Sequence, residues 1–486
     1  MHLFYKLPFG KLFFNLFLVA STPFCTKAQQ ATSGFSALGS AIYKDKIAEL
    51  DKYTVPKKYS EKSAQAWYDE ILTERKKALL GAFKDDDVIY DTLLLNKCNS
   101  IFNRIKASNP KFKFDTIKLY INRSVVANAA NYGEGTVMVN SGLFLWVDND
   151  DELALVLGHE MAHQLLDHFG SRVDKSITTL TSDEFKEELK KIKKADYGKF
   201  ERFRNLMKGV NIESGKHSVY KESEADSLGV QLARNAGFNT TNGSKILLKL
   251  DKVDDLFVAD KLYTLKDFVE KAPIDLSYFK PRPKYNGLSK VNITMNADKD
   301  FDSIKTHPDC IKRFESIAGK GNAATINCCS TLNDQYKIYK ENAMLEIVRY
   351  LYENGSIGYC THFCLFALKN NYDPAIYNYF LSLCFSKLYF KDKNLERFNA
   401  ANAAAKRGST LKDLQDFLFE MGSNDLATLS AWYLNYKPGA NSEDFEFANL
   451  MYNVQVKAKD KEAAYADFMK KFPNNKYLYL IQKKSK

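Results

Sequence analysis

Histidine is scarce in this chain, and long apolar runs are confined to its N-terminus. Only seven of the 486 residues are histidine, so a cluster of them needs an explanation. Beyond residue 30, no stretch approaches the roughly 20 apolar residues of a membrane-spanning helix. The sequence therefore predicts no transmembrane segment in the mature chain.

Acidic and basic residues are interspersed almost everywhere, and no motif of interleaved aromatic and basic residues is present. The net charge of +11 arises from 70 basic and 59 acidic residues, which indicates a mixed solvated surface. We therefore expect no nucleic-acid partner. A weak attraction to acidic surfaces, including peripheral association with a membrane, stays open.

The cysteines lack the pattern of a zinc ribbon. Cys328 and Cys329 are adjacent, and Cys360 and Cys364 do not complete paired CxxC knuckles. Of the eight cysteines, one (Cys25) lies in the N-terminal leader, so seven remain in the mature chain. An odd number leaves at least one unpaired, and the sequence does not fix which of the others pair.

Residues 1–28 are predicted to be a secretory signal peptide. Two lysines precede an apolar core at Leu12–Ala20, and the small residues Thr26 and Ala28 satisfy the rule for cleavage after residue 28. We therefore expect an exported protein, periplasmic or secreted. Two alternatives stay open: an uncleaved anchor helix, and a lipid attached at Cys25 that gives an outer-membrane-associated form.

Hydrophobic periodicity predicts a mainly α-helical domain with a small β-sheet, an α+β fold, at residues 29–320. Its N-terminal part, 29–113, has helical spacing. In the core, 114–320, apolar and polar residues alternate from Ile117 to Ile121, and Thr136–Asn140 is a second β-rich run. These two runs predict neighbouring strands.

Residues 321–486 are predicted to be an all-α domain. Amphipathic, aromatic-rich segments recur there and end at proline. The pattern resembles tetratricopeptide-type helix pairs, and a plain helical bundle is the alternative. A lysine-rich segment at 171–219 has two interpretations, a lid over a cleft or a solvated helical insertion.

Three of the seven histidines lie in one apolar stretch, LALVLGHEMAHQLLDH at residues 153–168. On a helix His159 and His163 share a face, so their two imidazoles can bind one metal ion. Glu160 is the next residue along the helix after His159, so it lies beside that face. This is the H-E-x-x-H pattern of zinc peptidases, in which the glutamate is the general base. Apolar flanks predict that the helix is buried.

The third ligand is predicted to come from a second helix, in YKESEADSLGVQLARNAGF. Glu222 and Asp226 are four residues apart, so Glu222 can bind the ion while Asp226 accepts a hydrogen bond from a ligating imidazole. Glu224 points about 200° away by the 3.6-residue turn of a helix and is expected in solvent. His168 is one residue too early for an HExxHxxGxxH site, so we expect it in an outer or structural role.

Together the motifs LGHEMAHQLLDH, ESEAD and ANAANYGEGTVMVNSGLF resemble HtpX-like and CAAX-prenyl-protease-like zinc metallopeptidases. The resemblance implies a zincin-type domain with one Zn²⁺ per chain, held by His159, His163 and Glu222, and an Asp226 that supports the ligands. It also implies that Asn128, Ala129 and the strand at 135–140 edge the cleft and bind substrate backbone as an added strand.

The stretch THPDCIKRFESI resembles the His-Pro segment of the same family. His307 then either gates the metal or stabilises an oxyanion together with Arg313; the alternative is that His307 only caps a helix before Pro308. The resemblance implies a zinc endopeptidase that acts on polypeptides in protein processing or quality control. The alternative is a chaperone-like protein that binds partners through its helical module, with an idle or gated metal site.

Overall fold

The computed structural model describes residues 36–259, 261–279, 310–319, 334–403, 405–406, 408–436 and 442–484, with backbone alone at 208–219, 254–259, 334 and 483–484. The predicted signal peptide, Cys25, His307, Cys328 and Cys329 lie outside these residues. Among the described residues, no helix combines the length and the apolar character that a membrane crossing requires.

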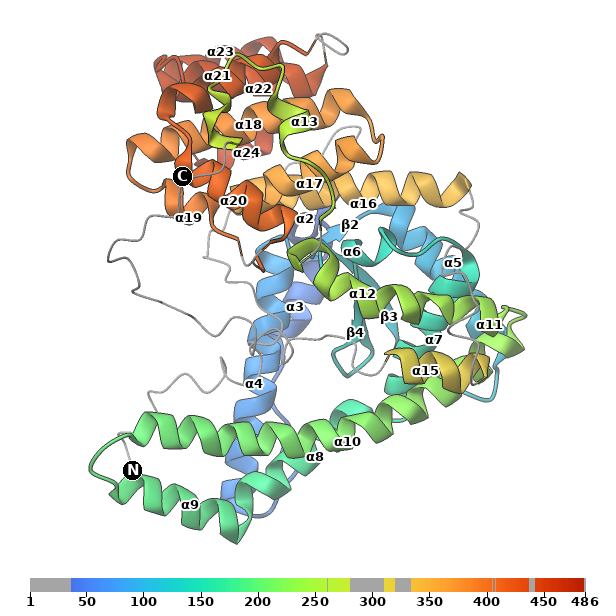
Figure 1. Cartoon of the computed structure of the whole chain (residues 1–486). Helices are drawn as coiled ribbons and strands as arrows, with labels where there is room; N and C mark the ends of the chain where they lie inside the picture. The colour runs from blue at the N-terminus through green and yellow to red at the C-terminus, as the bar shows by residue number, and fades with distance from the viewer. Residues whose placement is uncertain are drawn as a thin grey trace.

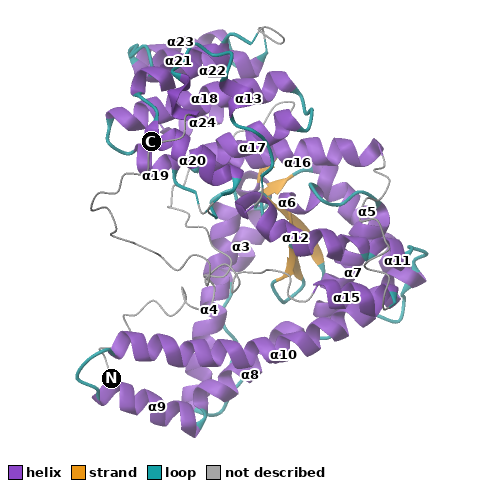
Figure 2. Cartoon of the chain, in the orientation of Figure 1, coloured by secondary structure: helices purple, strands orange, loops and turns teal. Residues whose placement is uncertain are grey.

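A small mixed sheet lies among the helices of the N-terminal half (Figure 2). The strands are β1 (Ala37–Leu38), β2 (Val88–Tyr90), β3 (Lys118–Asn122), β4 (Ala129–Asn131) and β5 (Thr136–Asn140). Their order is β1-β2-β3-β5-β4, with β3 and β5 parallel and the other pairs antiparallel. The two predicted strands are therefore neighbours, and β5 coincides with the predicted run.

Helices surround this sheet and continue into an all-α region, so the predicted α+β architecture followed by an all-α part is confirmed (Figure 1). The helices of the first part are α2 (Gly39–Ile42), α3 (Lys44–Lys52), α4 (Lys62–Lys84), α5 (Thr92–Ser108), α6 (Ser141–Phe144), α7 (Asp150–Leu165), α8 (His168–Thr181), α9 (Asp183–Lys194), α10 (Lys199–Asn235), α11 (Thr240–Gly243), α12 (Lys245–Ala259), α13 (Lys266–Val269), the 3-10 helix η1 (Leu276–Phe279) and α15 (Cys310–Ala318).

The C-terminal helices pack on one another and on the first part. They are α16 (Asp334–Glu353), α17 (Ile357–Lys369), α18 (Pro374–Lys393), α19 (Arg397–Ala401), α20 (Thr410–Glu420), α21 (Ser423–Leu434), α22 (Glu443–Gln455), α23 (Lys461–Lys471) and α24 (Leu478–Lys484). One continuous apolar core reaches from Ile89 in β2 to Ile481 in α24. Division at residue 320 and a tetratricopeptide-like repeat stay predictions.

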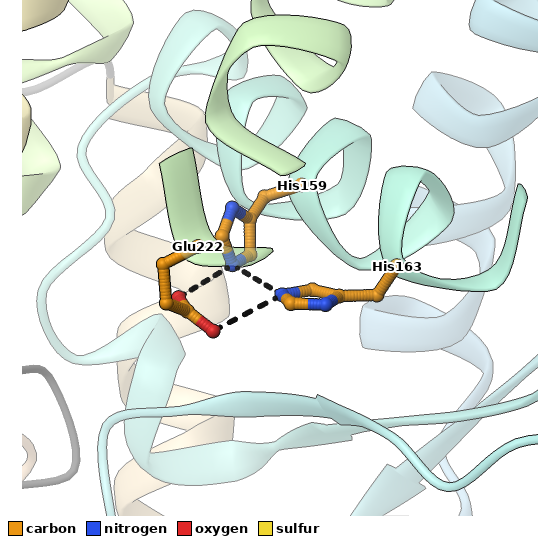
Figure 3. Close-up of side chains that lie close together, drawn as sticks. All are labelled: His159, His163 and Glu222. Atoms are coloured by element: carbon orange, nitrogen blue, oxygen red, sulfur yellow. Dashed lines mark hydrogen bonds and ion pairs between the residues drawn. The ribbon is translucent and has the colours of Figure 1, made fainter. Parts of the chain in front are cut away.

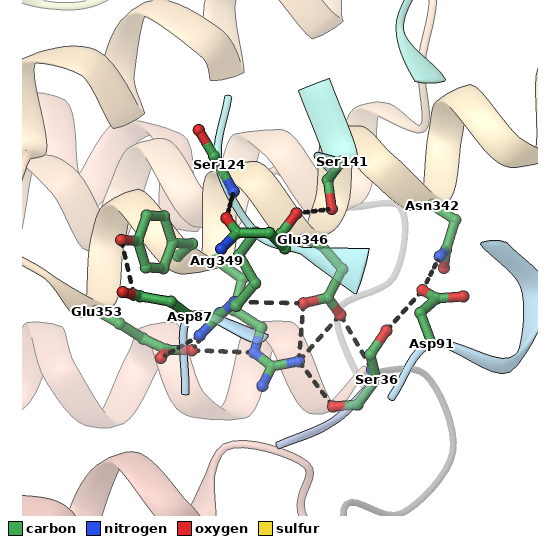
Figure 4. Close-up of polar contacts among 12 residues, drawn as sticks. Ser36, Asp87, Asp91, Ser124, Ser141, Asn342, Glu346, Arg349 and Glu353 are labelled. Atoms are coloured by element: carbon green, nitrogen blue, oxygen red, sulfur yellow. Dashed lines mark hydrogen bonds and ion pairs between the residues drawn. The ribbon is translucent and has the colours of Figure 1, made fainter. Parts of the chain in front are cut away.

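A buried polar network joins β3 to α16 (Figure 4). The guanidinium of Arg123, 1% exposed, donates to both carboxylate oxygens of Glu353 at 2.8 and 2.9 Å. Arg349, also 1% exposed, donates to Glu346 and Glu353 at 2.9 Å. Because an ionised group buried without its partner is costly, these contacts fix how the C-terminal helices sit on the sheet.

Residues 261–279 cross from the first part to the C-terminal helices. The hydroxyl of Tyr263 lies 2.8 Å from Nδ1 of His362 in α17, and the hydroxyl of Tyr278 donates to Asp425 at 2.7 Å. Cys360 and Cys364 are free, buried thiols in α17, Cys98 and Cys384 are free and buried as well, and Cys310 is buried in α15. Burial raises the pKa of the Cys360 and Cys364 thiols well above the usual value.

Candidate metal centre

Helix α7 carries the histidine motif into the core. Asn149 is its N-cap, and its side chain accepts from the backbone N–H of Glu152. Residues Leu153, Leu157 and Met161 of this helix are fully buried, which confirms the expectation from its apolar flanks. The helix therefore cannot rotate to bring its histidines to the surface.

Helix α10 crosses α7 at two glycines. A Cβ at Gly158 of α7 would lie 2.9 Å from the carbonyl oxygen of Gly229 in α10, and a Cβ at Gly229 would lie 2.8 Å from the backbone nitrogen of His159. Both distances are shorter than real Cβ contacts. Glycine at both positions lets the two backbones approach closely, and Glu222 lies two turns before Gly229 on the same face of α10.

This crossing brings three predicted ligands together (Figure 3). Nε2 of His159 lies 3.3 Å from one carboxylate oxygen of Glu222, and Nε2 of His163 lies 3.4 Å from the other. The two Nε2 atoms are 2.9 Å apart. Tetrahedral zinc at about 2.1 Å from each donor separates donors by about 3.4 Å, so the donor set fits a zinc ion.

Hydrogen bonds between these groups shift the pKa values of Glu222 and His159 in opposite directions. Burial would raise the pKa of Glu222, but hydrogen bonds with His159 and His163 outweigh it and hold that pKa far below the usual range. Burial lowers the pKa of His159, and its hydrogen bonds with Asp226 and Glu222 outweigh this effect and raise the pKa to about 9. Converging lone pairs at these distances need a proton or a metal ion between them.

A carboxylate and a guanidinium support His159 from behind. Nδ1 of His159 lies 2.9 Å from Asp226, and Arg313 donates to both oxygens of Asp226 at 2.7 Å. Nη2 of Arg313 lies 3.3 Å from the same Nδ1. Arg313 thus contacts the Nδ1 side of the imidazole, and its Nη1 also lies 3.6 Å from the carboxylate of Glu222. Its predicted contact with an oxyanion stays a prediction.

A second support reaches His163. Nδ1 of His168 lies 2.8 Å from Nδ1 of His163, and Nε2 of His168 lies 3.5 Å from the carboxylate of Glu224. His168 is 7% exposed, whereas Glu224 is 40% exposed. His168 therefore takes the outer position expected of it, and Glu224 is half in solvent but also faces His168, a contact that helical spacing alone did not predict.

Glu160, the predicted base, is 7% exposed and lies beside the ligands on α7. Burial raises the pKa of its carboxyl to about 7. A general base works best when this value is near the ambient pH. A divalent cation at the neighbouring ligands would favour the ionised form.

The edge of the sheet next to α7 is β4, not the strand at 135–140. β5 lies inside, between β3 and β4. Asn131 of β4 donates from Nδ2 to the carbonyl of Glu160 at 3.3 Å and to Gln164 at 3.2 Å, and Gln164 also accepts from the backbone N–H of Gly135 at 3.0 Å. Of the residues implied by the resemblance, Ala129 lies in β4, and Asn128 directly precedes it, with its carbonyl accepting from the backbone N–H of Asn140 at 3.0 Å.

A groove of about 700 Å³ lies between α10 and α15, and Glu222 is the proposed ligand that lines it. Ser227, Gln231 and Arg234 line it from α10, and Lys312 and Ser316 line it from α15. The lysine-rich segment 171–219 forms α8, α9 and the first half of α10, and Figure 1 shows its far end projecting away from the metal centre.

Residues 94–320 match the sequence model of peptidase family M48. Over 165 residues the chain is 26% identical to a protein from Yersinia pestis named "Beta-barrel assembly-enhancing protease". That alignment covers 34% of this chain and 34% of the relative, so the chain spans about a third of the relative's length. At residues 94–320 the chain therefore carries a peptidase family M48 domain, a metallopeptidase domain as the resemblance implied.

Proposed function

We propose that the chain is a zinc-dependent endopeptidase that hydrolyses peptide bonds of polypeptide substrates. The observation that carries the proposal is the convergence of His159, His163 and Glu222 with a buried Glu160 beside them. One Zn²⁺ per chain would be held by the three ligands. When bound, zinc lowers the pKa of water from about 15.7 to near 7 and polarises a carbonyl.

Glu160 supplies the proton transfers. Its carboxylate takes the proton of the attacking water and then gives it to the leaving amine. Burial raises the pKa of this carboxyl and a bound cation would lower it, so the two effects oppose each other at the group that transfers the proton. The contact of Asn131 with the Glu160 carbonyl holds this part of α7 against the sheet.

Two hydrogen-bonded pairs orient the ligands. Asp226, itself held by Arg313, accepts from Nδ1 of His159 and leaves Nε2 free to bind the ion. His168, with Glu224 behind it, does the same for His163. Because both imidazoles are fixed through Nδ1, the tautomer that each presents to the metal is set by the protein.

Substrate backbone would pair with the free edge of β4. An edge strand presents unpaired N–H and C=O groups that an extended peptide can meet. β4 runs beside α7, so a peptide added there passes the metal ligands. The basic side chains of Arg234 and Lys312 in the adjoining groove favour substrates with acidic or polar residues on one side of the cleaved bond.

We further propose that the protein is exported and acts in periplasmic protein processing or quality control. The predicted signal peptide supports export. The relative from Y. pestis is named as a protease that enhances β-barrel assembly, which is consistent with such a role. The alignment leaves about two thirds of that relative uncovered, so its name supports the proposed role only through the aligned part.

Glu160→Gln tests the proposal. The amide has nearly the same shape but cannot take a proton, so the variant should bind zinc like wild type and lose cleavage of an unfolded protein substrate by at least about 10²-fold. Glu187→Gln, an identical change at an exposed position of α9, is the control and should cleave normally.

Two outcomes would count against the peptidase. Cleavage that persists in Glu160→Gln would remove the glutamate from the reaction. A wild-type protein that holds zinc and protects unfolded proteins from aggregation, but leaves no fragments even at long incubation, would favour the chaperone-like alternative.

A further inference from the structure

The helical hairpin α9–α10 projects from the molecule and carries two exposed aromatic rings at its far end. Figure 1 shows the two helices running side by side to a turn well away from the sheet. At that turn Tyr197 is 87% exposed and Phe200 is 61% exposed. We call residues 190–200 the hairpin tip.

These two rings have no part in holding the hairpin together. The hairpin has its own small apolar core, in which Phe185 and Ile192 of α9 pack with Phe203 and Met207 of α10. All four are buried. Tyr197 and Phe200 lie outside this core, so their exposure to water needs another explanation.

The hairpin tip is strongly basic, in contrast to the mixed surface elsewhere. Residues 190–199 hold five lysines and one acid, Asp196, a net charge of 5 − 1 = +4. All five lysines are exposed; they are Lys190, Lys191, Lys193, Lys194 and Lys199. Among the described ion pairs, Lys191 is bonded to Glu188, one turn back on α9, and such an exposed pair neutralises little.

Exposed rings flanked by lysines fit the surface of an anionic bilayer. Tyrosine favours the level of the lipid headgroups, where its ring meets hydrocarbon and its hydroxyl meets water, and phenylalanine is buried at the boundary between headgroups and acyl chains. Lysines are attracted to anionic headgroups, and their long stems let the ammonium groups stay in water beside the rings. A convex tip suits a flat surface, whereas protein partners usually take aromatic anchors into pockets.

We propose that the hairpin tip docks the protein on an anionic lipid bilayer, with Tyr197 and Phe200 at the headgroup level. The contact is peripheral and reversible, because two rings and a few lysines bury little area. This docking also sets the distance of the metal centre from the membrane surface. Lys199 and Glu222 belong to one continuous helix, 23 residues apart, so Glu222 stands up to about 35 Å above the surface.

This proposal does not depend on catalysis. The inactive variant Glu160→Gln should dock as wild type does, so a failure of the peptidase and a failure of the docking are separate results. The distance between the hairpin tip and Glu222 determines which polypeptides the metal centre could reach. These are segments that lie some tens of ångströms from a membrane surface.

Vesicle flotation of the full mature chain tests it. The vesicles contain phosphatidylcholine and phosphatidylglycerol at about 3:1, and phosphatidylcholine alone is the comparison. Wild type should float with the anionic vesicles at low salt, float little with the neutral ones, and be released as salt rises, because screening weakens attraction between lysines and headgroups. The double change Tyr197→Ser, Phe200→Ser should weaken partitioning by roughly tenfold.

Charge at the tip is tested with a matched set. Changing Lys193, Lys194 and Lys199 to Gln should weaken binding to the anionic vesicles by roughly tenfold or more. The control changes three exposed lysines in and before α23, which alters net charge equally and should leave binding unchanged; these are Lys457, Lys459 and Lys461. Leu395→Ser, at a residue 95% exposed elsewhere, is the control for an apolar side chain.

Insertion of the tip is read with Tyr197→Trp. The tryptophan fluorescence should shift to shorter wavelength with anionic vesicles and be quenched by brominated acyl chains. Three results would overturn the proposal: no flotation of wild type, equal flotation of the tip variants and their controls, or binding of the tip to an acidic protein with no binding to vesicles.

Discussion

Replacing Gly229 by alanine would place a methyl group between α10 and α7. The new Cβ would lie 2.8 Å from the nitrogen of His159 and 2.9 Å from its Cα. Ordinary Cβ contacts begin at 3.4 Å, so the helices must separate by 3.4 − 2.8 = 0.6 Å at this point. The atoms in the way are backbone and cannot swing aside as the end of a side chain could.

That displacement is small for the fold and large for the metal centre. Overpacking costs about 1–3 kcal/mol, and alanine in a helix interior recovers about 1 kcal/mol relative to glycine, so the free energy of unfolding should fall by about 2 kcal/mol at most. Metal–ligand distances, in contrast, tolerate only about 0.2 Å. Glu222 moves with α10 while both histidines stay on α7, so the zinc Kd should rise at least about tenfold.

The assay is zinc competition against a chromophoric chelator, with thermal unfolding of the metal-free protein measured in parallel. Gly81→Ala in α4 is the control, because a Cβ there meets only Asp85, at an ordinary 3.7 Å. It should leave zinc binding unchanged and raise stability by up to about 1 kcal/mol. If Gly229→Ala binds zinc as tightly as Gly81→Ala does, the close crossing does not set the ligand geometry.

Two further predictions follow from contacts of single imidazoles. Asp226→Ala and His168→Ala should each raise the zinc Kd by about 10–100-fold, because each removes the group that orients one ligand. The absorption spectrum of the Co²⁺-loaded protein should change in both variants. His168→Asn can still hydrogen-bond to the imidazole of His163, so it should recover much of the lost affinity. If His168→Ala has a wild-type Co²⁺ spectrum and affinity, the contact with His163 is incidental. Burial lowers the pKa of His362 to about 3, below its usual 6.5, so the folded state favours the neutral ring and stability is lost as the pH falls from about 6.5 toward 3. The free energy of unfolding should fall by up to about 1.4 kcal/mol per pH unit more in wild type than in His362→Asn, and equal slopes in denaturant titrations would contradict this.

Local sequence patterns were sufficient to predict the features of this protein that depend on a single helix or a single strand. The four-residue spacing of His159 and His163 puts both on one face whatever surrounds the helix, and the same holds for Glu222 and Asp226. The β-rich run TVMVN located β5 at Thr136–Asn140. The confirmed α+β class follows from the same periodicities, because the spacing of apolar residues within a segment does not depend on what the segment packs against.

Helix boundaries inside the lysine-rich segment were predicted less well. The helix with Glu222 was expected to begin near Tyr220, but α10 begins at Lys199 and runs unbroken to Asn235. It ends just before Gly237, which takes a φ of 74°. The start was missed because a charged helix that packs on little apolar surface has a weak period.

Tertiary structure alone decided how distant segments meet. Gly158 and Gly229 are separated by 71 positions, and in the sequence each glycine only indicates a less stable position in a helix. The crossing of α7 and α10 shows that both glycines allow the two backbones to approach closely. The position of Arg313 behind His159, the contact of Glu224 with His168, and β4 as the edge strand all depend on packing between elements. The sequence by itself determined which side chains can bind a metal, because that is set by covalent spacing and helical period. Only the folded chain determined the distances between them, because these depend on how closely two backbones can pack.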